Sequence, residues 1–306
     1  MLKKKIIFIV GPTGIGKSAV AISLAKKIKA EIISTDSMQV YRKMDLITSK
    51  VNEAQRRGIK HHLLSIIKPT LEYNVARYRR DALLICNKLF KQGKIPLFAG
   101  GTGLYYSVII DGLFAAAPED KVIRAELYKQ AALKTSRYLY KKLARVDRMA
   151  AKKIHPNDTK RIVRALEVYL KTGNPISSLQ KQRKGLGPEY KIEIFGLNCG
   201  RQALYKKIEM RVEKMFSLGL IDEVKRLLKH KLSKTAACAI GIRELRGYFD
   251  GEYPLDHAKR LIQRNSRHYA KRQLTWFRKV KRIQWIKIKH KETPQGIAER
   301  IWKKLF

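Results

Sequence analysis

Hydrophobic residues in the first hundred positions form short β-branched runs that alternate with longer amphipathic segments. The runs IIFIV (6–10), EIIST (31–35) and IPLFAG (95–100) predict strands, because each ends at glycine or at a polar residue. The segments 17–28 and 74–94 carry apolar residues at helical spacing. Strands that alternate with helices predict an α/β fold, in which helices flank both faces of a parallel sheet.

The strand pattern stops at about Phe114 and gives way to helical spacing. The segment HPNDTKRIVRALEVYLKTGNP (155–175) predicts a helix that Asn157 or Asp158 caps and that Gly173 ends. A strand signal returns at KIEIFGLN (191–198), and the remainder of the chain is typical of helices. We therefore expect two domains: a core of residues 1–114 and 186–306, and an inserted helical domain of residues 115–185.

The stretch GPTGIGKS (11–18) lies between the first predicted strand and the first predicted helix. Its spacing, G-x-x-x-x-G-K-[ST], is that of a P-loop, in which backbone N–H groups and a helix N-terminus surround a diphosphate. Lys17 would supply a charge between phosphates, and the Ser18 hydroxyl could bind Mg²⁺. The alternative is a purely structural glycine turn. The strand before the loop and the helix after it favour the phosphate site.

Two further strand ends carry polar residues that could reach the same site. Asp36 follows the second predicted strand, and Thr102 follows two glycines after the third. In a parallel α/β sheet such strand ends line one crevice, so Asp36 and Thr102 should meet the P-loop. Asp36 could support Mg²⁺ or accept a proton from a nucleophile, or it could simply cap a following helix. The N-K-x-D base motif of GTPases is absent from the sequence.

The charge is strongly positive: 67 Lys and Arg stand against 25 Asp and Glu, for a formal net charge of +42. Such a field attracts polyanions, and nucleic acid is the leading partner. The alternative is a composition bias without a site. Residues 260–291 contain no acid, and Arg260, Arg264, Arg267 and Lys271 are spaced to share one helix face. Lys160, Arg161 and Arg164 cluster near the start of a second helix.

The cysteines and the apolar segments point to a reducing, aqueous compartment. Cys86, Cys199 and Cys238 lie far apart, which argues against a zinc ribbon and a disulfide framework. The apolar run at residues 6–10 is too short for a signal peptide, and no stretch approaches the ~20 apolar residues of a membrane span. We expect a cytoplasmic protein that contacts no membrane.

Several motifs together resemble the tRNA dimethylallyltransferases over about residues 5–280. They are GPTGIGKS, ISTDSMQVYRKMD, HHL, FAGGTGLYY, HPNDTKRIVRALEVY, AIGIREL and YAKRQLTWFR, in this order. The resemblance implies a P-loop NTPase-like core and Mg²⁺ as cofactor. It also implies transfer of a dimethylallyl group from dimethylallyl diphosphate to an adenosine amine, with release of diphosphate. The target adenosine is 3′-adjacent to the anticodon (position 37) in tRNAs that read codons beginning with U.

The resemblance also implies site residues, and it makes the inserted helical domain a clamp on the tRNA anticodon stem-loop. A clamp of this kind needs no second subunit, so we expect a monomer. The implied catalytic residues are Asp36, Lys17, Thr102 and Arg124. The implied diphosphate-binding residues are Gly11, Pro12, Thr13, Gly14, Ile15, Gly16, Lys17 and Ser18, with Ser18 at the metal. The implied tRNA-binding residues are Asp36, Ser37, Met38, Gln39, Lys160, Arg161, Ile162, Val163, Arg164, Cys238, Ala239, Ile240, Gly241, Ile242 and Arg243.

One loop departs from the family pattern. Where the family usually reads YRGMDIGTAKP, this chain reads YRKMDLITSKV (41–51), which limits the conformations of the loop near the adenine site. Three other functions stay open on the residues alone. They are an adenylate isopentenyltransferase that uses free nucleotides, a nucleoside or nucleotide kinase that binds ATP, and an RNA-binding module without activity. The inserted block and the basic helices favour tRNA over free nucleotides.

Overall fold

The computed structural model describes residues 3–114 and 118–306. The chain divides into two compact units, Met1–Ile109 with Pro188–Phe306, and Ile110–Gly187. The first residues of the predicted insertion, 115–117, lie outside the described residues. In the part of the chain that the structure describes, no helix has the length and apolarity of a membrane span.

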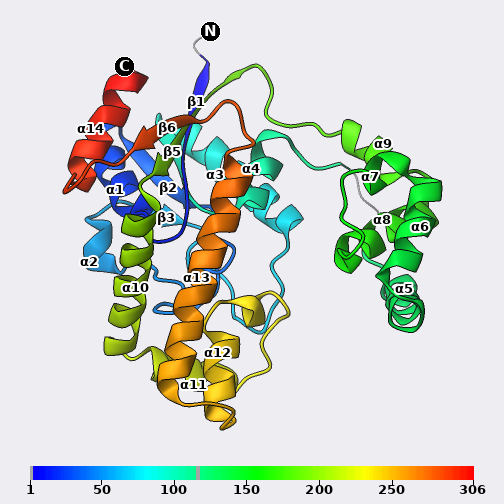
Figure 1. The fold of residues 1–306 in the computed structure, drawn as a ribbon. Helices are drawn as coiled ribbons and strands as arrows, with labels where there is room; N and C mark the ends of the chain where they lie inside the picture. Colours follow the sequence, from blue (N-terminus) through cyan, green and yellow to red (C-terminus); the bar gives the residue numbers. More distant parts are fainter. Residues whose placement is uncertain (1–2, 115–117) are drawn as a thin grey trace. The chain divides into compact units, whose positions relative to one another are not determined.

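The first unit is built on one six-stranded sheet among the described residues, and every pairing in it is parallel (Figure 1). The strand order is β3-β2-β4-β1-β5-β6. The predicted α/β fold is confirmed. The strands are β1 (Lys4–Val10), β2 (Ala30–Ser34), β3 (His61–His62), β4 (Ile95–Gly100), β5 (Tyr190–Asn198) and β6 (Gln284–Lys287).

The sequence did not predict the two edge strands. β3 is two residues long, and β6 buries only Ile286 of its four residues. Neither shows the apolar run or the alternation on which strand prediction depends. Helices cover both faces of the four inner strands, which favours continuous apolar runs in their sequences. Those runs are the signal from which these strands were predicted.

Helices pack on both faces of this sheet. On one face Ile7 and Ile9 join a core with α1, α10 and α14. On the other face Phe8 stacks on Phe98 at 4.6 Å between ring centroids, under Tyr106 of α4. The helices of this unit are α1 (Lys17–Lys27), α2 (Glu53–Arg56), α3 (Val75–Lys91), α4 (Gly103–Ile110), α10 (Arg201–Ser217), α11 (Leu220–Leu228), η1 (Ala236–Cys238), α12 (Ile242–Phe249), α13 (Leu255–Phe277) and α14 (Pro294–Leu305).

The second unit is helical over its described residues, and α8 shows the predicted ends. Asp158 accepts a hydrogen bond from the Arg161 N–H at 3.2 Å, and Gly173 ends the helix with φ 68°. Leu139 and Leu143 pack against α8 in the core of the unit. The helices are α5 (Lys121–Lys134), α6 (Ser136–Val146), α7 (Arg148–Ala151), α8 (Thr159–Thr172) and α9 (Ile176–Lys181).

The two ends of the second unit are bonded to each other. The Leu186 N–H donates to the Ile110 carbonyl at 3.2 Å, and Leu113 forms an antiparallel bridge with Lys184. Gly112, with φ 80°, lies so close to the Lys184 carbonyl that a Cβ at this position would collide with it. The chain therefore enters and leaves this unit along two paired segments.

The divergent loop at 41–51 keeps a glycine-like conformation without glycine. Lys43, at one of the two glycine positions of the family pattern, has φ 60°. Ile47, at the other, does not have positive φ and is buried at 5% exposure. An L-residue in the left-handed region is strained by about 1 kcal/mol. Of the two residues that replace family glycines, Lys43 is therefore the one with a strained backbone.

Replacing Lys43 by glycine is expected to raise the free energy of unfolding by about 1 kcal/mol, since it relieves the left-handed strain. Lys43 is exposed, so little packing is lost. Urea denaturation of the two proteins measures the change. Lys68→Gly is the control, because Lys68 is also exposed but has negative φ and precedes proline, so glycine there should destabilise. A destabilised Lys43→Gly protein would contradict the assignment of strain.

Candidate active site

The P-loop has the backbone that its glycines permit. Gly11, Gly14 and Gly16 have φ of 147°, 79° and 100°, a region that L side chains rarely adopt. A Cβ on Gly11 would lie 2.8 Å from the Leu197 carbonyl oxygen. A Cβ on Gly14 would lie 2.8 Å from Cγ1 of Ile208. The loop is therefore pressed against neighbouring backbone and helix α10, and it turns directly into the N-terminus of α1.

Two residues from distant helices fix this loop, and neither was among the predicted site residues, although Gln273 lies within the motif YAKRQLTWFR. The Thr13 N–H donates to Oε1 of Gln273 at 2.8 Å, and Nε2 of Gln273 donates to the Gly101 carbonyl at 2.9 Å. Nη1 of Arg211 donates to Oγ1 of Thr13 at 2.8 Å. Buried Gln273 thus joins the P-loop to the loop after β4, and Arg211 places a guanidinium at the P-loop.

The amine of Lys17 is hydrogen-bonded to the backbone of the P-loop. Its Nζ donates to the Pro12 carbonyl at 2.8 Å. Burial lowers the pKa of Lys17 to about 8; the Asp36 carboxylate opposes this shift and the Arg211 guanidinium adds to it. The site therefore holds the two cations of Lys17 and Arg211, and the carboxylate of Asp36 is the negative charge that interacts with both. This arrangement is stabilised by a bound polyanion.

The segments that carry Asp36 and Thr102 are bonded to each other after the ends of β2 and β4, but Thr102 does not line the cavity that the P-loop and Asp36 share. Oδ1 of Asp36 accepts from the Met38 N–H at 2.9 Å, so Asp36 caps a turn and does not start a helix. The Ser37 N–H donates to Oγ1 of Thr102 at 3.2 Å, and the Thr102 N–H donates to the Thr35 carbonyl at 3.0 Å. Thr102 therefore holds the segment that carries Asp36.

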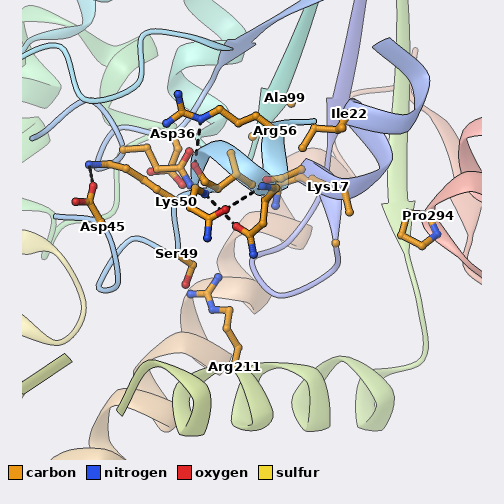
Figure 2. Close-up of a pocket in the computed structure, with 18 of the residues that line it drawn as sticks. Lys17, Ile22, Asp36, Asp45, Ser49, Lys50, Arg56, Ala99, Arg211 and Pro294 are labelled. Atoms are coloured by element: carbon orange, nitrogen blue, oxygen red, sulfur yellow. Dashed lines mark hydrogen bonds and ion pairs between the residues drawn. The ribbon is translucent and has the colours of Figure 1, made fainter. Parts of the chain in front are cut away.

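These elements surround a cavity of about 950 Å³ (Figure 2). Asp36 and Gln39 line it, together with the segment 45–57, the C-terminal part of α10 and the P-loop residues Thr13, Gly14, Gly16, Lys17 and Ser18. The predicted diphosphate residues Gly11, Pro12 and Ile15 are buried behind this wall. Its lining carries more positive than negative side chains: Lys17, Lys50, Arg56, Arg57, Arg211 and Lys214 against Asp36, Asp45 and Glu53. A concave site with this charge suits a phosphate-bearing ligand.

Ser18 and Asp36 supply a hydroxyl and a carboxylate to the wall of this cavity. Oxygen ligands of this kind suit Mg²⁺, which usually takes few protein ligands and completes its shell with water and phosphate. Among residues 3–114 and 118–306 no group of three or more His, Cys, Asp or Glu could hold a metal without such help.

Arg124 and the segment 160–164 belong to the second unit, and the segment 238–243 of the first unit does not line this cavity. Arg124 lies in the second unit, where Glu119 and buried Glu167 bind its guanidinium at 2.8 and 3.1 Å. In the segment 160–164, Lys160 and Arg161 are exposed, but Ile162 and Val163 are core residues. In the segment 238–243, Cys238 and Arg243 are exposed, whereas Ala239 and Ile242 are buried. The side chains of Ile162, Val163, Ala239 and Ile242 therefore cannot contact tRNA as predicted, because packing removes them from the surface.

Comparison with known proteins relates the whole chain to one group of enzymes. It matches the family model described as IPP transferase over residues 39–280, and the model described as Isopentenyl transferase over residues 4–69. It is 46% identical to the tRNA dimethylallyltransferase of Carboxydothermus hydrogenoformans, over 98% of this chain and 97% of that protein.

Solved structures show the same relation. The full-length tRNA isopentenylpyrophosphate transferase from Bacillus halodurans has a TM-score of 0.72 and 36% identity, over 99% of this chain and 97% of that one. A eukaryotic dimethylallyltransferase acting on tRNA has a TM-score of 0.76 and 28% identity, over 93% of this chain and 74% of that one.

Proposed function

The chain belongs to the IPP transferase family, and we propose that it transfers a dimethylallyl group from dimethylallyl diphosphate to tRNA. The acceptor is the exocyclic amine of the adenosine 3′-adjacent to the anticodon (position 37), in tRNAs that read codons beginning with U. One observation carries the proposal: the P-loop with Lys17 and Arg211 shares a single cavity with the carboxylate of Asp36. The cavity thus offers an anion site next to a base.

The diphosphate is bound by the loop Gly11 to Ser18. The backbone N–H groups after Thr13, whose own N–H is bound to Gln273, and the N-terminus of α1 would face the phosphates, and Lys17 and Arg211 add two charges. In the reaction the bond between the allylic carbon and the diphosphate oxygen breaks, and the electron pair leaves with the diphosphate. The same donors then stabilise the charge that develops on the leaving group.

Asp36 acts as the base. The adenine amine is a weak nucleophile because its lone pair is delocalised into the ring, so it gains from losing its proton as the carbon–nitrogen bond forms. Asp36 lines the cavity that holds the P-loop, and its bond to the Met38 N–H leaves the other carboxylate oxygen available to the amine. Thr102 holds the backbone next to Asp36, and we propose it as a positioning residue.

Mg²⁺ is the proposed cofactor, with Ser18 as its candidate ligand. When bound it would neutralise charge on the diphosphate oxygens. The kinase alternative would use the same loop for ATP. Family membership and the position of Asp36 favour the prenyl transferase over it.

The helical unit Ile110–Gly187 is the proposed tRNA clamp, with Lys160, Arg161 and Arg164 among its basic residues. In the core, Ser37 to Gln39 and the exposed residues of segment 238–243 are proposed tRNA contacts. Arg124 remains a proposed contributor to the reaction channel. A clamp carried by the same chain needs no second subunit, so we propose a monomer, and a tRNA substrate agrees with a cytoplasmic enzyme.

One assay separates the candidate functions. The protein is incubated with radiolabelled dimethylallyl diphosphate, Mg²⁺ and either unmodified tRNA transcript or AMP. We expect label on tRNA at the adenosine next to the anticodon. Label on AMP alone would replace this proposal with the free-nucleotide class, and ATP turnover without prenyl transfer would indicate a kinase.

The affinity for tRNA is expected to fall by about a hundredfold between about 50 and 200 mM salt, because phosphate contacts release counterions. Arg260 and Arg264 are exposed on α13, so Arg260→Gln and Arg264→Gln should each lower the salt slope by about one. Lys303→Gln on α14 is the control for general charge. Filter binding across salt concentrations measures the slopes. An affinity for tRNA that does not change with salt would mean that the positive net charge is a composition bias and does not bind phosphates.

A further inference from the structure

A buried carboxylate outside the cavity holds part of its wall. Glu223 of α11 is 7% exposed. Its Oε2 accepts from the N–H groups of Asp45 and Leu46 at 3.0 and 2.9 Å, and its Oε1 accepts from the Ile47 N–H at 2.9 Å. One side chain thus binds three consecutive amides from a segment far away in the sequence. Burying a carboxylate is costly, and this set of charge-assisted bonds offsets the cost.

The bound segment carries residues that face the cavity. Asp45, Leu46, Ser49 and Lys50 all line it (Figure 2). The side chain of Lys50 is 3% exposed, and its Nζ contacts the Tyr41 carbonyl and lies 2.8 Å from Oδ1 of Asp45. Burial lowers the pKa of Lys50, while the carboxylates of Asp45, Glu223 and Asp36 oppose that shift. A buried ammonium therefore stands in the field of the proposed base.

Most of the other bonds of the loop are local, but Oγ of Ser49 also donates to Sδ of Met215 on α10 at 3.6 Å. Oγ1 of Thr48 donates to the Met44 carbonyl at 2.6 Å, and Nε2 of Gln39 donates to the Thr48 carbonyl at 3.2 Å. The local bonds shape the turn, and the bond to the Met215 thioether is weak because sulfur is a poor acceptor. Glu223 supplies the long-range anchor, from a helix that itself packs in the core through Leu220 and Val224.

We propose that Glu223 is a positioning residue of the transfer reaction, which holds the loop 45–50 so that Lys50 stays at the wall of the cavity that Asp36 also lines. The inference rests on the proposed function for its kinetic part. The fixed ammonium of Lys50 then contributes positive charge to the field around the Asp36 carboxylate. Glu223 does not touch the substrate; it acts through the loop.

The first test compares Glu223→Gln with Asp222→Asn. Glutamine keeps the size of the side chain but turns an NH₂ group toward backbone N–H donors, so at least one of the three bonds is lost. Asp222 is an exposed acid on the same helix, so its variant controls for charge and for α11. We expect kcat for transfer to fall about tenfold in Glu223→Gln, with KM for dimethylallyl diphosphate within about threefold and Asp222→Asn unchanged.

A second measurement does not need activity. Hydrogen exchange at the amides of residues 45–47 should accelerate about tenfold or more in Glu223→Gln, while the amides of β1 stay protected. Labelling of Lys50 by acetic anhydride should also increase, because the loosened loop exposes its amine. Glu223→Asp keeps the charge but shortens the reach, and it should fall between wild type and Glu223→Gln. It serves as the folded variant if Glu223→Gln does not fold.

The double variant Glu223→Gln with Lys50→Met decides whether the effect passes through Lys50. If it does, the double variant transfers no more slowly than Lys50→Met alone, whereas additive losses would overturn that route. Wild-type exchange at 45–47 in Glu223→Gln would overturn the anchoring itself. A wild-type protein that transfers nothing would refute the proposed function, and the exchange and labelling results would still decide whether Glu223 holds the loop.

Discussion

Replacing Asp36 by asparagine is expected to lower the rate of dimethylallyl transfer by about a thousandfold. Asparagine can still accept the Met38 N–H bond, which is 2.9 Å long in the wild type, so the turn after β2 should keep its shape. It cannot take a proton from the adenine amine. The loss should therefore appear in kcat, while the affinities for dimethylallyl diphosphate and for tRNA stay within a few-fold of wild type.

Single-turnover assays with preloaded tRNA measure this loss directly. Asp222→Asn serves as the control, since it removes an exposed carboxylate from the same unit without touching the cavity. Unchanged turnover in Asp36→Asn would remove Asp36 from the mechanism. A loss confined to tRNA affinity would make it a binding residue only.

Replacing Lys17 by methionine is expected to weaken the binding of dimethylallyl diphosphate by about a hundredfold to a thousandfold. The amine is buried among Pro12, Asp36 and Arg211, so water cannot replace its charge at the diphosphate. Calorimetric titration without tRNA measures the affinity. Lys214→Met, an exposed lysine of the same cavity, should lose much less.

The affinity of wild type should also depend on pH in a defined direction. Burial places the pKa of Lys17 at about 8 in the free enzyme, and a bound diphosphate favours the ammonium. Below pH 8 Lys17 is charged before and after binding, so its contribution to affinity is constant. Above pH 8 binding must take up a proton, and the affinity should fall by up to about tenfold per pH unit. This break should vanish in Lys17→Met and persist in Lys214→Met; a wild-type affinity without a break near pH 8 would contradict the role of the buried amine.

The central part of the site could be predicted because its residues follow predicted strands. The P-loop, Asp36 and Thr102 each come directly after an apolar run, and a parallel sheet brings such ends to one edge. Arg211, Gln273 and Glu223 could not be found in this way. They sit inside amphipathic helices, where a polar residue at one position looks like any solvent-facing one. Only the tertiary packing shows that they reach the P-loop and the loop 45–47.

In the segments predicted to bind tRNA the error was the opposite one, because residues without a suitable position were assigned to the site. Motif resemblance assigned a function to every residue of 160–164, including Ile162 and Val163. The helical spacing of the same residues already placed these two on the apolar face of α8, and the structure buries both. Periodicity was the better guide to side-chain direction, and the assignment of the segment to tRNA stays a prediction.

The paired ends of the helical unit make it a cassette. Because Leu186 is bonded to Ile110 and Leu113 is bridged to Lys184, the chain enters and leaves at one place. A short turn could close that gap without altering the order of the strands, and insertions between neighbouring chain ends are the ones that folds tolerate best. The part of the protein proposed to grip tRNA could therefore be exchanged or lost over evolutionary time while the sheet with its P-loop and Asp36 remained intact.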